Sequence, residues 1–101
     1  MKAFDFRNGG WGWDVDHLKN INDTLSEVCG WARGISIGDY IIRKGTKAPV
    51  HISRVVTIRY ENDPPDMFFA TLENLGSCDS LEDFCESEGA TIVSGNSGIR
   101  I

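Results

Sequence analysis

The densest group of side chains able to do chemistry is Asp14-Val15-Asp16-His17, which places two carboxylates and an imidazole within one short run. Such a D-x-D-H run binds a metal ion when further oxygen ligands converge on it. The same residues also fit the first turn of a helix, with Asp14 as the N-cap and Asp16 where the helix dipole favours an anion. We favour the capping interpretation and predict neither a metal site nor a cofactor.

The sequence does not supply a set of residues that reads as a catalytic site. The glycines at 9, 10 and 12 precede an expected helix but lack the spacing and the lysine of a phosphate-binding loop. Cys29, Cys78 and Cys85 are odd in number and have no C-x-x-C spacing, which leaves too few close ligands for zinc. We therefore predict that the protein is not an enzyme.

Charge is distributed unevenly along the chain, whose net charge is −5. Residues 33–59 carry six basic residues against Asp39 alone, whereas residues 60–99 carry nine acidic residues and no basic one. The basic segment, expected as a hairpin over 40–59, is a candidate site for nucleic acid or a small anion. Its candidate contacts are Arg43, Lys44, Lys47, Arg54 and Arg59. The simplest alternative is that the acidic half neutralises this hairpin.

The acidic half predicts a different surface, one suited to a basic protein partner. A short helix over 80–88 is expected to display several carboxylates together, and tryptophan is enriched at interface hot spots. The candidate partner-binding residues are Glu82, Asp83, Glu86, Glu88, Trp11 and Trp13. The alternative for the two tryptophans is that they hold the N-terminal arm against the sheet.

These surfaces predict a small non-enzymatic protein-binding module. Its partner would be a larger basic protein or complex, and the module would occupy a basic surface of nucleic-acid-handling machinery. Compact acidic proteins of this length, including phage-encoded ones, often inhibit such machinery, although this is an analogy of size and charge. Binding of nucleic acid or a small anion through the 40–59 hairpin is the alternative function.

Hydrophobic periodicity predicts the elements that position these residues. Apolar side chains recur at helical spacing over residues 15–32, which predicts an amphipathic helix there. A second, short helix over 80–88 begins at Ser80 as N-cap and ends at Gly89. Strands are expected over 3–7, 40–44, 50–61, 66–74, 91–93 and 99–101, the second to fourth of which would form a β-meander.

Arg54 is an anomaly within the longest expected strand. Under strict alternation, the even-numbered residues from Val50 to Tyr60 lie on one face of the strand. The others on this face are apolar, but Arg54 is also even-numbered. A bulge would shift this parity, yet the pattern resumes unshifted at Val56. We therefore predict that Arg54 points inward, either at a barrel mouth or paired with a carboxylate such as Asp39 or Glu73.

Residues 37–72, which contain Gly38-Asp39, resemble small β-barrels of the SH3-like or PUA-like kind. In those barrels a Gly-Asp turn often opens a strand that pairs with a longer, bent neighbour. Some PUA-related domains that handle RNA carry a Gly-x-Lys-x-x-Glu-x-Arg motif. Gly45 and Lys47 match its start, but Val50 and Ile52 stand where the Glu and Arg belong. The resemblance therefore implies a fold and gives no reason to expect RNA binding.

The expected fold class is α+β, in one domain over residues 1–101. It comprises a small, strongly bent antiparallel sheet or barrel of five to six strands, one N-terminal amphipathic helix and one short acidic helix. No apolar run approaches the roughly 20 residues needed to span a bilayer. The first residues are too polar for a signal peptide, so we expect a cytoplasmic protein.

Overall fold

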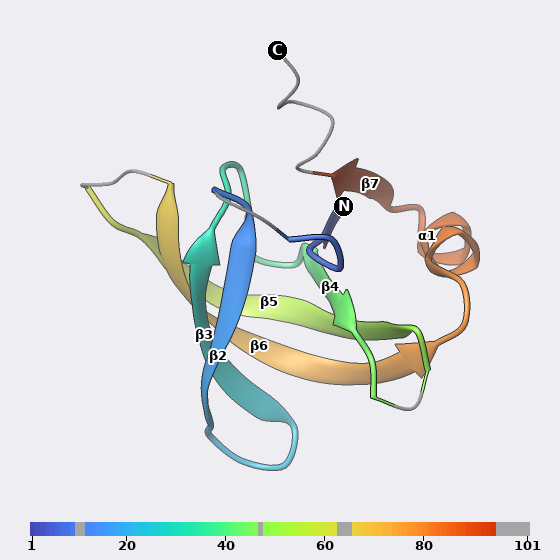
Figure 1. Ribbon diagram of the computed structural model, residues 1–101, viewed down its shortest axis with the longest axis horizontal. Helices are drawn as coiled ribbons and strands as arrows, with labels where there is room; N and C mark the ends of the chain where they lie inside the picture. The colour runs from blue at the N-terminus through green and yellow to red at the C-terminus, as the bar shows by residue number, and fades with distance from the viewer. Residues whose placement is uncertain (10–11, 47, 63–65, 95–101) are drawn as a thin grey trace.

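The computed structural model describes residues 1–9, 12–46, 48–62 and 66–94. Of these described residues 58% are in strands and 9% in a helix, so the fold is mostly β, and the strands form one seven-stranded sheet of order β2-β3-β6-β5-β4-β1-β7 (Figure 1). The elements are β1 (Lys2–Asp5), β2 (Asp14–Asn20), β3 (Leu25–Trp31), β4 (Tyr40–Lys44), β5 (Val50–Tyr60), β6 (Met67–Cys78), α1 (Leu81–Glu88) and β7 (Thr91–Ser94). Strand β1 pairs in parallel with β4 and β7, and the other pairs are antiparallel.

The predicted fold class, an α+β fold with a bent antiparallel sheet or barrel of five to six strands and two helices, is wrong. The predicted helix over 15–32 is the hairpin β2–β3 instead. Its turn is organised by the Asn22 side chain, whose Oδ1 accepts hydrogen bonds from the backbone N–H groups of Thr24 (2.9 Å) and Leu25 (3.0 Å). An asparagine that bonds the backbone two and three residues on competes with a helix and favours a turn.

Gly30 explains why β3 lies so close to its neighbours. A Cβ atom there would stand 2.2 Å from the carbonyl oxygen of Asp14 and 3.0 Å from the Phe68 ring. Only glycine therefore permits this approach of β2 and β6 to β3. A glycine inside a helix costs about 1 kcal/mol relative to alanine, so residue 30 was evidence against the helix that the apolar spacing alone suggested.

The curled sheet buries apolar side chains on both of its faces. The inner core lies inside the curl and contains Phe4, Phe6, Val28, Ala32, Ile35, Ile41, Val55, Phe68, Ala70 and Leu72. The outer core lies between the sheet and α1 and contains Ala3, Tyr40, Ile42, Val50, Ile52, Leu81 and Cys85. Neighbouring residues such as Ala3 and Phe4 are both fully buried because α1 covers the second face of the central strands.

The meander of β4, β5 and β6 is confirmed by their antiparallel pairing. The prediction that the even-numbered residues of β5 all share one face is wrong. Val50 and Ile52 belong to the outer core, whereas Ile58 and Tyr60 pack on the inner core. The alternation reverses at a register shift between Val55 and Thr57, where a bulge occurs. Arg54 therefore points outward, not inward.

The short acidic helix is confirmed as α1. The Ser80 hydroxyl accepts a hydrogen bond from the Asp83 backbone N–H at 3.2 Å, and Gly89 ends the helix in the left-handed conformation. Leu81 and Cys85 face the outer core. Beyond α1, β7 pairs with β1, while residues 99–101 of the predicted terminal hairpin lie outside the described residues.

Within the described part of the chain, α1 is the one helix, and its eight residues are too few and too polar to cross a bilayer.

Candidate functional site

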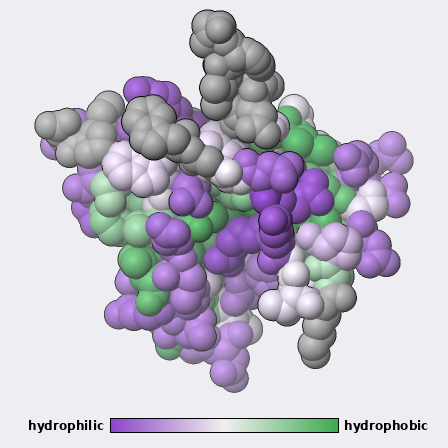
Figure 2. All heavy atoms as spheres, viewed as in Figure 1, coloured by the Kyte–Doolittle hydropathy of each residue, from purple (hydrophilic) through white to green (hydrophobic). Residues whose placement is uncertain are grey.

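The hairpin β2–β3 and strand β4 lie on opposite sides of the central strands β5 and β6 (Figure 1). Side chains from these strands line a polar pocket of about 320 Å³. Its lining consists of His17, Asn20, Ser26, Arg43, Lys44, Gly45, Thr46, His51 and Asn74. These residues include Arg43, Lys44 and two imidazoles and, among the described residues, no carboxylate. Figure 2 shows a band of hydrophilic side chains over this side of the molecule.

The pocket exists because the inner faces of several strands change from apolar to polar at the same level. On β4, Ile41 of the inner core is followed two residues later by Arg43; on β6, Leu72 is followed by Asn74. Residues two apart share a face of a strand. The same change occurs from Val55 to Ser53 and His51 on β5 and from Val28 to Ser26 on β3. One end of the curl is thus an apolar core and the other end is polar.

Arg43 is the central cation of this pocket. Its Nη2 donates to the Ser53 hydroxyl oxygen at 3.3 Å, and that hydroxyl donates to Asn74 Oδ1 at 3.2 Å. These two successive hydrogen bonds engage the amide oxygen of Asn74 and leave its NH₂ group free to donate elsewhere. Burial lowers the pKa of the Arg43 guanidinium below its ordinary value because the charged form loses solvation.

Two buried polar atoms of the pocket residues lack a partner within the described part of the chain, namely Ser26 Oγ and Arg43 Nε. Ser26 is only 1% exposed. Leaving a buried donor unpaired costs about 1–3 kcal/mol, and more when the group is charged. Native proteins therefore satisfy such groups with protein, water or ligand, and a ligand with acceptor atoms would do so here.

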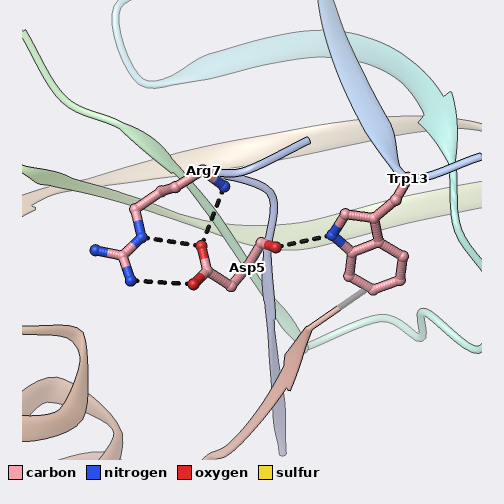
Figure 3. Close-up of polar contacts among 3 residues, drawn as sticks. All are labelled: Asp5, Arg7 and Trp13. Carbon is pink, nitrogen blue, oxygen red and sulfur yellow. Dashed lines mark hydrogen bonds and ion pairs between the residues drawn. The ribbon is translucent and has the colours of Figure 1, made fainter. Parts of the chain in front are cut away.

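A second hollow of about 440 Å³ adjoins the pocket and shares Arg43 and Lys44 with it. Its other lining residues are Phe6, Arg7, Gly9, Asp14 and Val15. Arg7 is held by Asp5 through Nε–Oδ1 (2.9 Å) and Nη2–Oδ2 (3.0 Å) contacts, and this hydrogen-bonded pairing raises the pKa of Arg7 (Figure 3). Much of its charge is therefore compensated within the protein.

Of the predicted anion-binding residues, the structure brings Arg43 and Lys44 together in the pocket. Arg54 forms an exposed ion pair with Glu73, so one predicted partner is confirmed although the inward direction is wrong. Arg59 pairs with Glu61 at 2.6 Å and lies over the Phe69 ring at 4.9 Å. Lys47 lies outside the described residues.

The predicted partner-binding residues do not all lie together. Glu82, Asp83, Glu86 and Glu88 are exposed along α1. Trp13 instead contacts β1 and the segment after it. Its Nε1 donates to the Asp5 carbonyl oxygen at 2.8 Å (Figure 3), and its ring stacks on Phe6 with 4.9 Å between the ring centroids. This position fits the alternative in which tryptophan holds the N-terminal arm. Trp11 lies outside the described residues.

Sequence reasoning missed four polar side chains that complete the pocket, which are His17, Asn20, Ser26 and Asn74. They come from three different strands, β2, β3 and β6, and no motif joins them. Only knowledge of which residues of each strand point inward would have grouped them. Three of them lie within 15–32, where a helix was predicted, so their strand faces could not be assigned.

The D-x-D-H run lies on β2, not on a helix, so Asp14 is not an N-cap. Among the described residues no three His, Cys, Asp or Glu side chains are grouped closely enough to hold a metal ion.

No known family model, no curated protein and no solved structure matches this chain.

Proposed function

We propose that this protein is a non-enzymatic binding module whose ligand presents a small anionic group to the polar pocket. The observation that carries this proposal is the half-buried Arg43, whose buried Nε has no partner among the described residues, in a lining without a carboxylate. A buried cation without a counter-charge is costly. An anion that accepts from Arg43, Ser26 and Asn74 would remove this cost.

A small anion fits this arrangement better than a nucleic acid does. Two of the basic residues along the predicted hairpin, Arg54 and Arg59, are engaged with Glu73 and Glu61. The net charge of −5 also opposes a polyanion, which interacts with charge over a wide surface. A compact anion would need only the donors of the pocket.

The test is a titration with inorganic phosphate, followed by amide chemical shifts and calorimetry. Arg43→Gln removes the buried charge, and Arg54→Gln is the matched control because it removes an exposed arginine from the same sheet. A charge-assisted hydrogen bond contributes about 1.5–3 kcal/mol, which corresponds to a loss of roughly 10- to 150-fold in affinity for Arg43→Gln. Equal binding by both variants, or no binding by the wild type, would reject the proposal.

The acidic face of α1 supports a second function, recognition of a basic protein. Among the three ion pairs of the described residues, none involves Glu82, Asp83, Glu86 or Glu88. No described arginine or lysine of the basic hairpin pairs directly with them, although the Tyr40 hydroxyl donates to Glu88 Oε1 at 3.4 Å. This is the inhibitor-like role that the charge distribution predicts, with a larger basic protein of nucleic-acid-handling machinery as partner.

Charge replacement on α1 tests this second function. The triple variant Glu82→Gln, Asp83→Asn and Glu86→Gln should keep the fold and slow association with a basic partner, and the difference should shrink as salt rises. A triple variant that captures the partner at the wild-type rate would reject this role.

The three cysteines form no disulfide among the described residues, which supports a reducing, cytoplasmic location.

A further inference from the structure

The second hollow continues directly from the polar pocket, because Arg43 and Lys44 form part of the wall of both. A ligand that binds Arg43 through an anionic group would therefore extend its remaining atoms into this hollow. The two volumes, about 320 and 440 Å³, lie in the range of small-molecule sites. A bare inorganic anion would occupy only the first.

The chemistry of the second hollow differs from that of the pocket. Phe6 and Val15 provide apolar surface, and the charge of Arg7 is compensated by Asp5. Asp14 brings a carboxylate, of which Oδ1 accepts the Val15 backbone N–H at 2.9 Å. The ion pairs of the described residues do not involve Asp14. This hollow thus presents a hydrogen-bond acceptor, whereas the pocket presents donors.

Gly9 leaves room beside that acceptor. A Cβ atom at residue 9 would stand 3.1 Å from the Trp13 carbonyl oxygen and 3.4 Å from Asp14 Oδ1. Trp13 is itself fixed by its hydrogen bond to the Asp5 carbonyl oxygen (Figure 3) and by its stacking on Phe6. The Asp14 carboxylate therefore borders a hollow with one well-anchored wall.

We propose that the ligand is a small organic phosphate whose body donates hydrogen bonds to Asp14 while its phosphate lies at Arg43. This inference rests on the proposed anion-binding function and adds the class of ligand. Donors converge on the pocket from three strands, through Ser26 of β3, Arg43 and Lys44 of β4 and Asn74 of β6. Several donors suit a tetrahedral group with three acceptor oxygens, and a hydroxyl-bearing body of sugar-phosphate size suits a hollow that joins the apolar surface of Phe6 and Val15 to the Asp14 carboxylate.

The experiment compares three probes by calorimetry: inorganic phosphate, ribose 5-phosphate and ribose. Wild-type protein should bind ribose 5-phosphate at least about tenfold more tightly than inorganic phosphate, and ribose more weakly than either. Asp14→Asn should weaken ribose 5-phosphate by about tenfold, because a carboxylate accepts hydroxyl hydrogen bonds more strongly than a neutral amide does. The same variant should bind inorganic phosphate as tightly as wild type or slightly more so, because a negative charge has been removed.

Asp16→Asn is the matched control, since Asp16 is exposed on the same strand and lines neither hollow. It should leave all three affinities unchanged. Equal affinities of wild type for inorganic phosphate and ribose 5-phosphate would overturn the ligand class and leave anion binding in place. An Asp14→Asn variant with wild-type affinity for ribose 5-phosphate would do the same. Failure of both phosphates to bind would instead reject the anion-binding function itself.

Discussion

Arg43 Nη2 donates a hydrogen bond to Ser53 Oγ at 3.3 Å, from one strand of the meander to the next. Because Ser53 then donates to Asn74 Oδ1, a single hydroxyl orients a cation and an amide at the polar end of the curl. Ser53 is fully buried, so a water molecule could not readily take over its hydrogen bonds with Arg43 and Asn74. The geometry of the pocket therefore depends on a residue that does not line it.

Ser53→Ala should lower the unfolding free energy by about 1–3 kcal/mol, because it leaves buried polar partners unsatisfied. Urea unfolding measures this. Ser77→Ala is the control, since Ser77 is exposed on β6, and its effect should stay within about 0.5 kcal/mol. Phosphate affinity should also fall in Ser53→Ala. Retention of wild-type stability and affinity would show that the hydrogen-bond chain is dispensable.

Asn22→Ala should destabilise the β2–β3 hairpin. Asn22 Oδ1 accepts from two backbone N–H groups and, at 3.2 Å, from the Thr24 hydroxyl, so we expect a loss of about 1 kcal/mol in unfolding free energy. Asp23→Ala changes the adjacent exposed residue and should cost less. Amide hydrogen exchange across 14–31 would report the loosening directly, and identical exchange in both variants would contradict the role of Asn22.

The hairpin also shows where sequence reasoning fails and why. Val15, Val28 and Ala32 matched a helical stripe, but strand spacing accommodates the same residues once a turn interrupts the run at 21–24. Pairing of β3 with β6 across seven residue pairs then decides the outcome. Such long-range pairing overrides local periodicity. The local signals that favoured a hairpin were Asn22-Asp23 and Gly30.

Gly30→Ala tests the close approach of the three strands. The added methyl group would stand 2.2 Å from a backbone oxygen, which side-chain rotation cannot relieve, so we expect destabilisation of about 2 kcal/mol or more. Gly9→Ala is a graded control, because its nearest atom is 3.1 Å away, and its cost should be smaller. Thermal unfolding compares the two, and the reverse order would contradict the packing of β3 against β2 and β6.

The candidate site could be predicted only in part. Arg43 and Lys44 were identifiable from charge alone, whereas Arg54 has the same charge and lies outside the pocket. The difference arises from strand parity and a bulge, and neither can be read from residue types when both faces of a sheet are buried. Ser26 and Asn74 become neighbours only through the order β3-β6-β5.

Stability should decline at alkaline pH, partly through Cys85. Burial raises the pKa of this thiol above its ordinary value of 9.0, with smaller contributions from Glu82 and Cys78. The folded state thus holds a proton that the unfolded state releases, so its stabilising contribution is complete below about pH 9 and is lost as pH rises through the raised pKa. Cys85→Ala should show a shallower decline in urea midpoint between pH 8 and pH 10.5. Parallel declines would contradict this contribution.

Arg43→Met should separate stability from binding. In anion-free buffer the native state holds the Arg43 charge at a cost, as its lowered pKa indicates, and methionine fills similar space without a charge. The unfolding free energy of Arg43→Met should therefore equal or exceed that of wild type. At phosphate concentrations near 100 times the dissociation constant, wild type should gain about 2.7 kcal/mol by mass action, and Arg43→Met should gain little.

Arg54→Met provides the comparison for that experiment. It removes an exposed arginine whose partner is Glu73, so its unfolding free energy should change by less than about 1 kcal/mol and it should keep the full stabilisation by phosphate. A different pattern, in which Arg43→Met is clearly less stable than wild type without anion, would mean that the Arg43–Ser53 bond outweighs the cost of burying the charge. Arg43 would then belong to the fold, and the case for an anion as its missing partner would be lost.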